Sequence, residues 1–260
     1  MTEDEWLSCT DPLDMIGVPE VRSSERKMRL FVIACCRRVW HLLSQPHYCY
    51  AVEIAERFAD GDASMKELAR ARAVAEARYM EEFESTPSTT SAKMAAPSRA
   101  FQAASLAFSE PGLLLSKYHT FAGRYRAGSY GVMRGVDGAA NAVAYWSTKD
   151  GEREANEAAG AAEQIEQCRL LRDLIGNPFL PLTIKSELLS WNEAVVLHLA
   201  QAAYDNRVLP SGTLDNTRLA ILADALEEAG CTDRRILGHL RCDADHYRGC
   251  FVIDALLGKS

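Results

Sequence analysis

Two histidines and two cysteines lie within one twelve-residue stretch, HLRCDADHYRGC, which covers residues 239 to 250. Imidazole nitrogens and thiolates are donors that zinc prefers in structural sites. The four residues are His239, Cys242, His246 and Cys250. Their spacing would place all four on one face of a continuous helix, where they would extend over about 16 Å. Ligands of one zinc ion lie only about 2.0–2.3 Å from it, so a shared site requires a break in the chain between Arg241 and His246.

The residues between the histidines permit such a break, because aspartate favours turns and helix caps. With a turn at Asp243–Asp245, a zinc site of two histidines and two cysteines becomes possible, and Cys231 is a further candidate ligand. A polar corner explains the same residues without metal. In that interpretation, Asp243 or Asp245 caps the last helix, the histidines bond to loop carbonyls and the cysteines fill the core. The sequence favours this corner.

A catalytic thiol is the third interpretation, with Cys250 or Cys36 as nucleophile. A cysteine nucleophile needs an imidazole within hydrogen-bond reach and a third group that orients it. His246 is a candidate partner, but the chain shows no strand–turn–helix elbow, no phosphate-binding glycine loop and no HExxH motif. We therefore predict no catalytic or cofactor-binding residues, and no cofactor other than zinc as an alternative.

Helix signals dominate the elements that must position these side chains. Capping-box patterns begin at Thr2, Ser64 and Ser190, each with a glutamate three residues later. Gly176, followed by Pro178, predicts the end of a helix over about 151–175. Because no convincing run of alternating apolar and polar residues occurs, the sequence predicts an all-α protein, a globular array of about nine to eleven helices.

Ser24 is expected to begin a long helix that runs to about Ser44. One face of this helix is apolar, whereas arginines gather on the other side. They are Arg22, Arg26, Arg29 and Arg37. We expect their stems to pack on apolar surface while their charged ends either extend to solvent or pair with the abundant carboxylates. The alternative, a face that binds phosphate or nucleic acid, is disfavoured by the net charge of −7.

The 260 residues suit a single helical domain, 1–260, or two packed lobes, 1–84 and 99–260, joined by a flexible segment at 85–98 that is rich in Pro, Ser and Thr. The N-terminal MTEDEW lacks the pattern of a signal peptide. The apolar run LFVIACC is far shorter than the roughly 20 residues that cross a bilayer. These features predict a cytoplasmic protein, without membrane contact, whose eight cysteines are reduced.

Four segments resemble a large paralogous family of helical proteins from planctomycete bacteria. They are LFVIACCRRVWHLL, LLRDLIGNPF, ILADALEEAGCTD and HYRGCFVIDALLGK. The resemblance covers about the first sixty and the last ninety residues, and residues 62–150 match only in being alanine-rich and helical. Members carry HCR where this chain has HLRC, so that Leu240 replaces their cysteine, whereas His239, His246 and Cys250 fit the pattern. The resemblance implies no established activity.

The sequence favours a non-catalytic, cytosolic helical interaction or regulatory module with a protein partner rather than nucleic acid. The first alternative is a zinc-binding protein whose His/Cys site lies in the 231–250 region. The second is a thiol-dependent enzyme.

Overall fold

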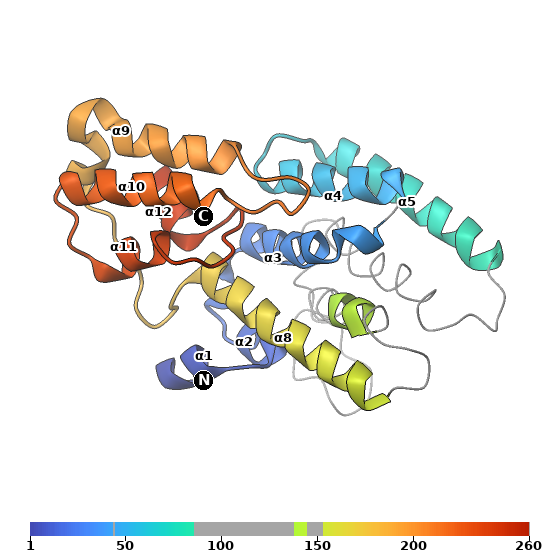
Figure 1. The fold of residues 1–260 in the computed structure, drawn as a ribbon. Coiled ribbons are helices and arrows are strands. Elements are labelled where there is room, and N and C mark those ends of the chain that lie inside the picture. The colour runs from blue at the N-terminus through green and yellow to red at the C-terminus, as the bar shows by residue number, and fades with distance from the viewer. Residues whose placement is uncertain (44, 86–137, 145–152, 260) are drawn as a thin grey trace. The chain divides into compact units, whose positions relative to one another are not determined.

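The computed structural model describes residues 1–43, 45–85, 138–144 and 153–259, and Figure 1 shows its elements. The protein is all-α, as the sequence predicts. Among the described residues no β-strand forms, and the only extended pairings are two isolated bridges that link Thr213 to Val208 and to Tyr247. In the same residues, no helix is both long and apolar enough to cross a membrane.

The chain divides into two compact units, Met1–Arg169 and Leu170–Ser260. Helix α8 (Arg153–Ile175) begins in unit 1, and its last turns belong to unit 2. The segment 85–98, predicted to join two lobes, lies outside the described residues except for Ser85. The two-lobe division at that segment therefore stays a prediction.

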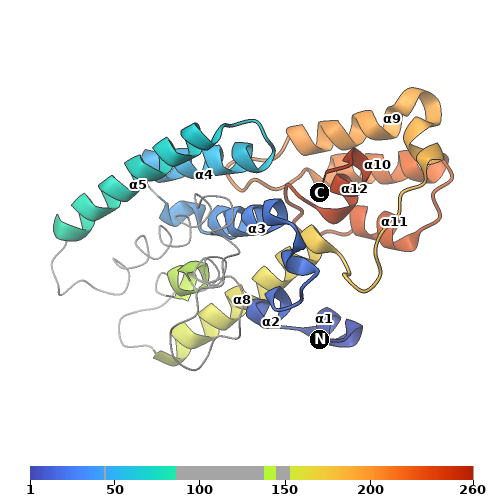
Figure 2. The same cartoon turned by 180° about the vertical axis from the view of Figure 1, so that it is seen from behind.

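Unit 1 contains short helices at its start and longer ones after them. Their bounds are α1 Glu3–Ser8, α2 Pro12–Ile16, α3 Glu25–Arg38, α4 Pro46–Ala59 and α5 Met65–Ser85, followed by a helical segment at 138–144. Single 3-10 turns occur at Val21–Ser23 (η1) and Trp40–Leu42 (η2). Helix α4 packs against both α3 and α5, and Figure 2 shows these helices from behind.

Local capping signals explain where several of these helices begin. The predicted capping boxes at Thr2 and Ser64 are confirmed. Each of these side chains accepts a hydrogen bond from the backbone amide of the glutamate three residues later, and that glutamate's carboxylate accepts one from the backbone amide of the Thr or Ser. Ser24 caps α3 by accepting the Lys27 amide. Helix α3 ends at Arg38 instead of near Ser44, because the chain tightens into the 3-10 turn η2.

Three of the four arginines, Arg26, Arg29 and Arg37, pair with carboxylates, as expected, whereas Arg22 lies in η1 before α3 and donates to the Gly17 carbonyl. Arg26 contacts Asp60, and Arg29 bonds to Glu25 on its own helix and lies over the ring of Phe58. Two further pairs join helices. Arg37 bonds to Glu56 of α4, and Arg38 makes a two-pronged contact with Glu163 of α8, within unit 1. These ion pairs tie α3 to its neighbours and account for an arginine-rich helix in an acidic protein.

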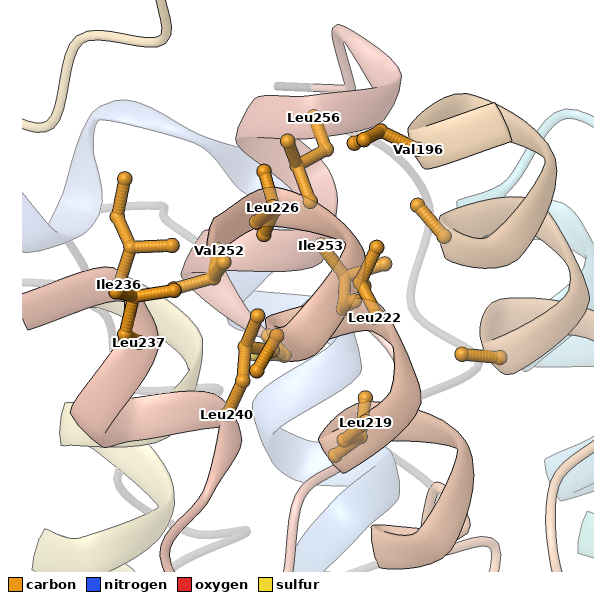
Figure 3. Close-up of a cluster of buried hydrophobic side chains, with 14 of the residues drawn as sticks. Val196, Leu219, Leu222, Leu226, Ile236, Leu237, Leu240, Val252, Ile253 and Leu256 are labelled. Carbon is orange, nitrogen blue, oxygen red and sulfur yellow. The ribbon is translucent and has the colours of Figure 1, made fainter. Parts of the chain in front are cut away.

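Unit 2 packs four helices around one apolar core. They are α9 Ser186–Asp205, α10 Asn216–Glu228, α11 Arg234–Leu240 and α12 Phe251–Leu257. Figure 3 shows how Val196 of α9, Leu222 of α10, Leu240 of α11 and Ile253 of α12 converge. Burial of such side chains contributes roughly 1.5–3 kcal/mol each. Unit 2 therefore has an apolar core independent of any bound ion.

Helix α9 contains a sharp irregularity that the sequence does not predict. Trp191 is extended, and the next three residues, Asn192, Glu193 and Ala194, are left-handed, with φ of 46°, 57° and 63°. The predicted capping box at Ser190 and Glu193 is wrong. The Ser190 hydroxyl instead donates to the carbonyls of Ser186 and Glu187, one turn earlier.

We expect glycine at position 194 to stabilise the protein. Left-handed backbone costs an L-residue roughly 1 kcal/mol, which glycine avoids. Ala194→Gly should therefore raise the midpoint of thermal unfolding by about 2 °C. Ala202→Gly, in the regular part of α9, is the matched control and should lower it by a similar amount, because glycine weakens a normal helix by about 1 kcal/mol. Equal losses in both variants would show that Ala194 is right-handed in solution.

Candidate metal centre

Four side chains from separate elements of unit 2 meet at one point. Asp173 lies in the last turn of α8, which ends where Gly176 adopts a left-handed φ of 73°. His239 lies on α11, His246 lies in the following loop, and Cys250 is the N-cap residue of α12. The predicted break between Arg241 and His246 is confirmed, since α11 ends at Leu240 and α12 begins at Phe251. This turn brings the two histidines together.

Backbone contacts hold the loop that carries His246. The His246 carbonyl accepts the Leu214 amide at 2.7 Å, and the Ala244 carbonyl accepts the Asn216 side-chain amide at 3.2 Å. The Cys250 amide donates to the Tyr247 carbonyl at 2.9 Å. The predicted cap of the last helix by Asp243 or Asp245 is wrong. Both aspartates are exposed, and Cys250 occupies the cap position, although its side chain does not cap the helix by a hydrogen bond.

The donor atoms of the four residues all lie within 4.8 Å of one another. His246 Nδ1 is 2.7 Å from Asp173 Oδ1, and His239 Nε2 is 3.2 Å from the same oxygen. His239 Nε2 is also 3.1 Å from Cys250 Sγ. Cys250, His246 and Asp173 are buried, with 0%, 1% and 5% of their surface exposed, and the His239 side chain is 17% exposed. The four donors therefore form a closed cluster.

Asp173 is ionised at neutral pH despite its burial. Burial by itself raises the pKa of this carboxyl, but the hydrogen bonds and charges of His239 and His246 outweigh it and lower the pKa to about 2. The backbone amide of Tyr247 donates to the other carboxylate oxygen at 2.9 Å. Asp173 thus presents one anionic oxygen to the cluster while its second oxygen is held by the backbone.

Cys242 contacts the cluster from outside. Its Sγ lies 3.4 Å from His246 Nε2, the ring nitrogen that faces away from Asp173, and its thiol donates to the His239 carbonyl at 3.0 Å. If a metal binds His246 Nδ1, the ring proton must reside on Nε2, where the Cys242 sulfur lies within reach as an acceptor. Outer contacts of this kind orient metal-binding histidines in known sites.

The geometry of the cluster fits a tetrahedral zinc ion. Ligands at about 2.0–2.3 Å from zinc lie roughly 3.3–3.7 Å from one another. Three donor pairs are 2.7, 3.1 and 3.2 Å apart, and no pair is more than 4.8 Å apart, so pairs of donors would shift by up to about 1 Å relative to one another to admit the ion. One carboxylate and one thiolate also balance the two positive charges.

No match was found. Neither protein-family models, nor curated proteins, nor solved structures are similar to this chain at a significant level. The chemistry of the centre is accordingly argued from its own residues.

Three of the four sequence-predicted ligands, His239, His246 and Cys250, belong to the cluster, and Cys242 lies beside it. Cys231 lies in the apolar core of unit 2. The fourth donor, Asp173, was not predicted, because it precedes His246 by 73 positions and nothing in its local sequence distinguishes it from other helical aspartates. Its position near the helix stop at Gly176 was the only available signal.

The thiol of Cys36, the other candidate nucleophile, is fully buried in α3. Burial raises its pKa to about 12, although the nearby Arg37 acts in the opposite direction. Since only the thiolate is an effective nucleophile, we expect Cys36 to resist iodoacetamide in the native protein at pH 8 and to react after denaturation. Mass spectrometry of the modified peptides checks this, with Cys9, which is not buried, as the internal control. Modification of Cys36 as fast as that of Cys9 would contradict it.

Proposed function

We propose that unit 2 binds a single zinc ion through Asp173, His239, His246 and Cys250, and that this ion has a structural role. The observation that carries the proposal is the convergence of the four donor atoms, all within 4.8 Å of one another. Two neutral imidazoles, one carboxylate and one thiolate form a neutral complex with a divalent ion. Buried charges persist in proteins when they are paired or coordinate a metal.

The types of donor favour zinc over the hard cations. Magnesium and calcium take oxygen ligands, six or more for calcium, whereas this centre offers one oxygen, two nitrogens and one sulfur. A thiolate combined with imidazoles suits Zn²⁺, and tetrahedral geometry is typical of its structural sites. Cobalt, which accepts the same ligands, is the natural spectroscopic substitute.

The arrangement of the ligands favours a structural ion over a catalytic one. Four protein ligands complete a tetrahedron, whereas catalytic zinc keeps one position open for water. The ligands come from the end of α8, from α11, from the loop and from the start of α12. The ion would thus fasten the end of α8 to α11 and α12, which lie far from it in the sequence, and would hold the irregular loop between α11 and α12. A structural ion of this kind is compatible with the non-catalytic helical interaction or regulatory module that the sequence favours.

A thiol-dependent enzyme is the competing function, and two contacts support it. Cys250 Sγ lies 3.1 Å from His239 Nε2, and Cys242 Sγ lies 3.4 Å from His246 Nε2, whose Nδ1 contacts Asp173 Oδ1 at 2.7 Å. In a catalytic triad the thiol contacts one ring nitrogen while the orienting carboxylate contacts the other. At His239, Asp173 approaches the same nitrogen as the thiol, Nε2, at 3.2 Å, which suits metal ligation better than proton relay. At His246 the thiol and the carboxylate lie on opposite ring nitrogens, but the Cys242 thiol has a closer acceptor, the His239 carbonyl, at 3.0 Å.

Elemental analysis of the purified full-length protein tests the proposal. We expect about one zinc per chain when the protein is purified without a metal-affinity column. Removal of the zinc by a strong chelator should lower the melting temperature, because metal binding contributes to the free energy of folding. Re-addition of zinc, but not of magnesium, should restore the melting temperature. Less than about a tenth of an equivalent, with no response to chelator or added zinc, would exclude the site.

A further inference from the structure

The aromatic ring of Phe251 lies against the metal centre without supplying a ligand. Phe251 follows Cys250 directly and begins α12. Its ring centroid is 4.5 Å from that of His239, with the ring planes at 57°. The ring of His246 lies at the same centroid distance from His239, at 75°. The His239 imidazole is therefore packed against two other rings.

Ring packing matters for His239 because rotation about the last side-chain bond of histidine is only weakly restricted by intrinsic preference. The Nε2 atom must point at Asp173 Oδ1 and Cys250 Sγ, which it approaches at 3.2 and 3.1 Å. His239 is also the most exposed member of the cluster, with 17% of its side chain accessible. Contacts with neighbouring rings must therefore fix the direction of Nε2.

Gly176 provides the surface on which the Phe251 ring rests. A Cβ atom at position 176 would lie 2.8 Å from Cδ2 and 2.9 Å from Cγ of Phe251, closer than any real contact allows. Gly176 also has a φ of 73°, and it follows Asp173 by one helical turn. One aromatic ring thus lies between a histidine ligand and the backbone end of the helix that carries the carboxylate ligand.

We propose that Phe251 is a positioning residue of the zinc centre and that Gly176 is required because it leaves room for the Phe251 ring. The inference rests on the proposed zinc site. A side chain at position 176 would push the ring outward and turn His239 Nε2 away from the ion. Loss of outer support of this kind weakens metal affinity by about 10–100-fold in known sites.

Titration of the metal-free, full-length protein with Co²⁺ tests the proposal, because cobalt absorption bands report both affinity and ligand geometry. We expect Phe251→Leu and Gly176→Ala each to weaken Co²⁺ binding by about 10-fold or more and to shift the visible bands. The effects should not add, because the side chain at 176 harms the site through the Phe251 ring. In a Phe251→Ala background, which lacks the Cγ and Cδ2 atoms that a Cβ at 176 would meet, Gly176→Ala should therefore change affinity by less than about 3-fold.

Gly230→Ala is the matched control. Gly230 also has a left-handed φ, of 92°, but a Cβ there meets nothing within 4 Å. It carries the same backbone penalty without the clash, so its Co²⁺ affinity and spectrum should equal those of the unchanged protein. The positioning role is wrong if Gly230→Ala weakens binding as much as Gly176→Ala, or if both Phe251→Leu and Gly176→Ala bind Co²⁺ normally. In either case the zinc site itself stands. If the unchanged protein binds neither Co²⁺ nor Zn²⁺, the zinc site fails and the positioning role fails with it.

Discussion

Replacing Asp173 with asparagine is expected to remove zinc from the protein, reducing the content from about one ion per chain to less than about a tenth. The amide has nearly the shape of the carboxylate, so the helix end and the Tyr247 contact should persist. It lacks the negative charge, however, and the two imidazoles and one thiolate that remain are a poorer site for a divalent ion. The melting temperature of Asp173→Asn should match that of the chelator-treated original protein and should not respond to added zinc.

Cys242→Ala is the decisive comparison, because Cys242 is the fourth ligand that the sequence predicts and Asp173 is the one that the cluster contains. We expect Cys242→Ala to keep about one zinc, with affinity reduced by about 10-fold through loss of the contact to His246 Nε2. Competition with a coloured chelator measures both variants under the same conditions. Retention of zinc by Asp173→Asn and its loss from Cys242→Ala would show instead that two histidines and two cysteines bind the ion, as the sequence predicts.

The sequence predicts Cys242 as the fourth ligand, whereas the structure places Asp173 in the cluster, and this difference shows which ligands local sequence can predict. His239, His246 and Cys250 lie within twelve positions, so their spacing and the intervening aspartates were enough to predict a turn that brings them together. Asp173 reaches them only through the folding of unit 2, and no local pattern links it to residues 73 positions away. The carboxylate of the proposed site therefore could not be predicted from the local sequence.

Helix boundaries likewise divide into those that local sequence predicts and those that tertiary packing determines. The capping boxes at Thr2 and Ser64 are correct because the four residues involved settle the geometry by their own hydrogen bonds. Ser190 and Glu193 have the same spacing, yet the backbone there turns left-handed and the Ser190 hydroxyl donates to carbonyls of the preceding turn. Unit 2 packs α9 on both sides of this turn, with Leu188 and Val196 buried. Tertiary packing of the two halves of α9 thus overrides a local signal.

The arginines of α3 were predicted to extend to solvent or to pair with carboxylates, but the sequence did not say with which carboxylates. Arg37 meets Glu56 because α3 and α4 pack together, and both side chains are almost fully enclosed, with 1% and 3% exposed. The Arg37 guanidinium also lies 4.1 Å from the centre of the Trp40 ring. Such a pair is costly to break, because the remaining charge stays buried without its partner.

Glu56→Gln is accordingly expected to destabilise the protein by about 3–5 kcal/mol. The amide preserves the size of the side chain but removes the buried negative charge that lies 2.8 Å from the Arg37 guanidinium. Thermal unfolding followed by circular dichroism should show a midpoint lowered by roughly 10 °C. Replacing both partners by apolar residues of similar volume, Arg37→Met with Glu56→Leu, should recover much of this loss, since the desolvation cost of the charges disappears as well.

The matched control is Glu76→Gln on α5, which removes the partner of Arg72 in a pair of similar length, 2.7 Å, whose side chains are 35% and 45% exposed. Solvent screens this pair, so its loss should change stability by less than about 1 kcal/mol. The comparison holds the substitution, the unit and the bond length nearly constant. The two pairs differ in burial and in that Arg72 and Glu76 lie on one helix, whereas Arg37 and Glu56 join two. Equal losses from Glu56→Gln and Glu76→Gln would mean that the Arg37–Glu56 pair is open to water, and that α3 and α4 pack less closely than the structure has them.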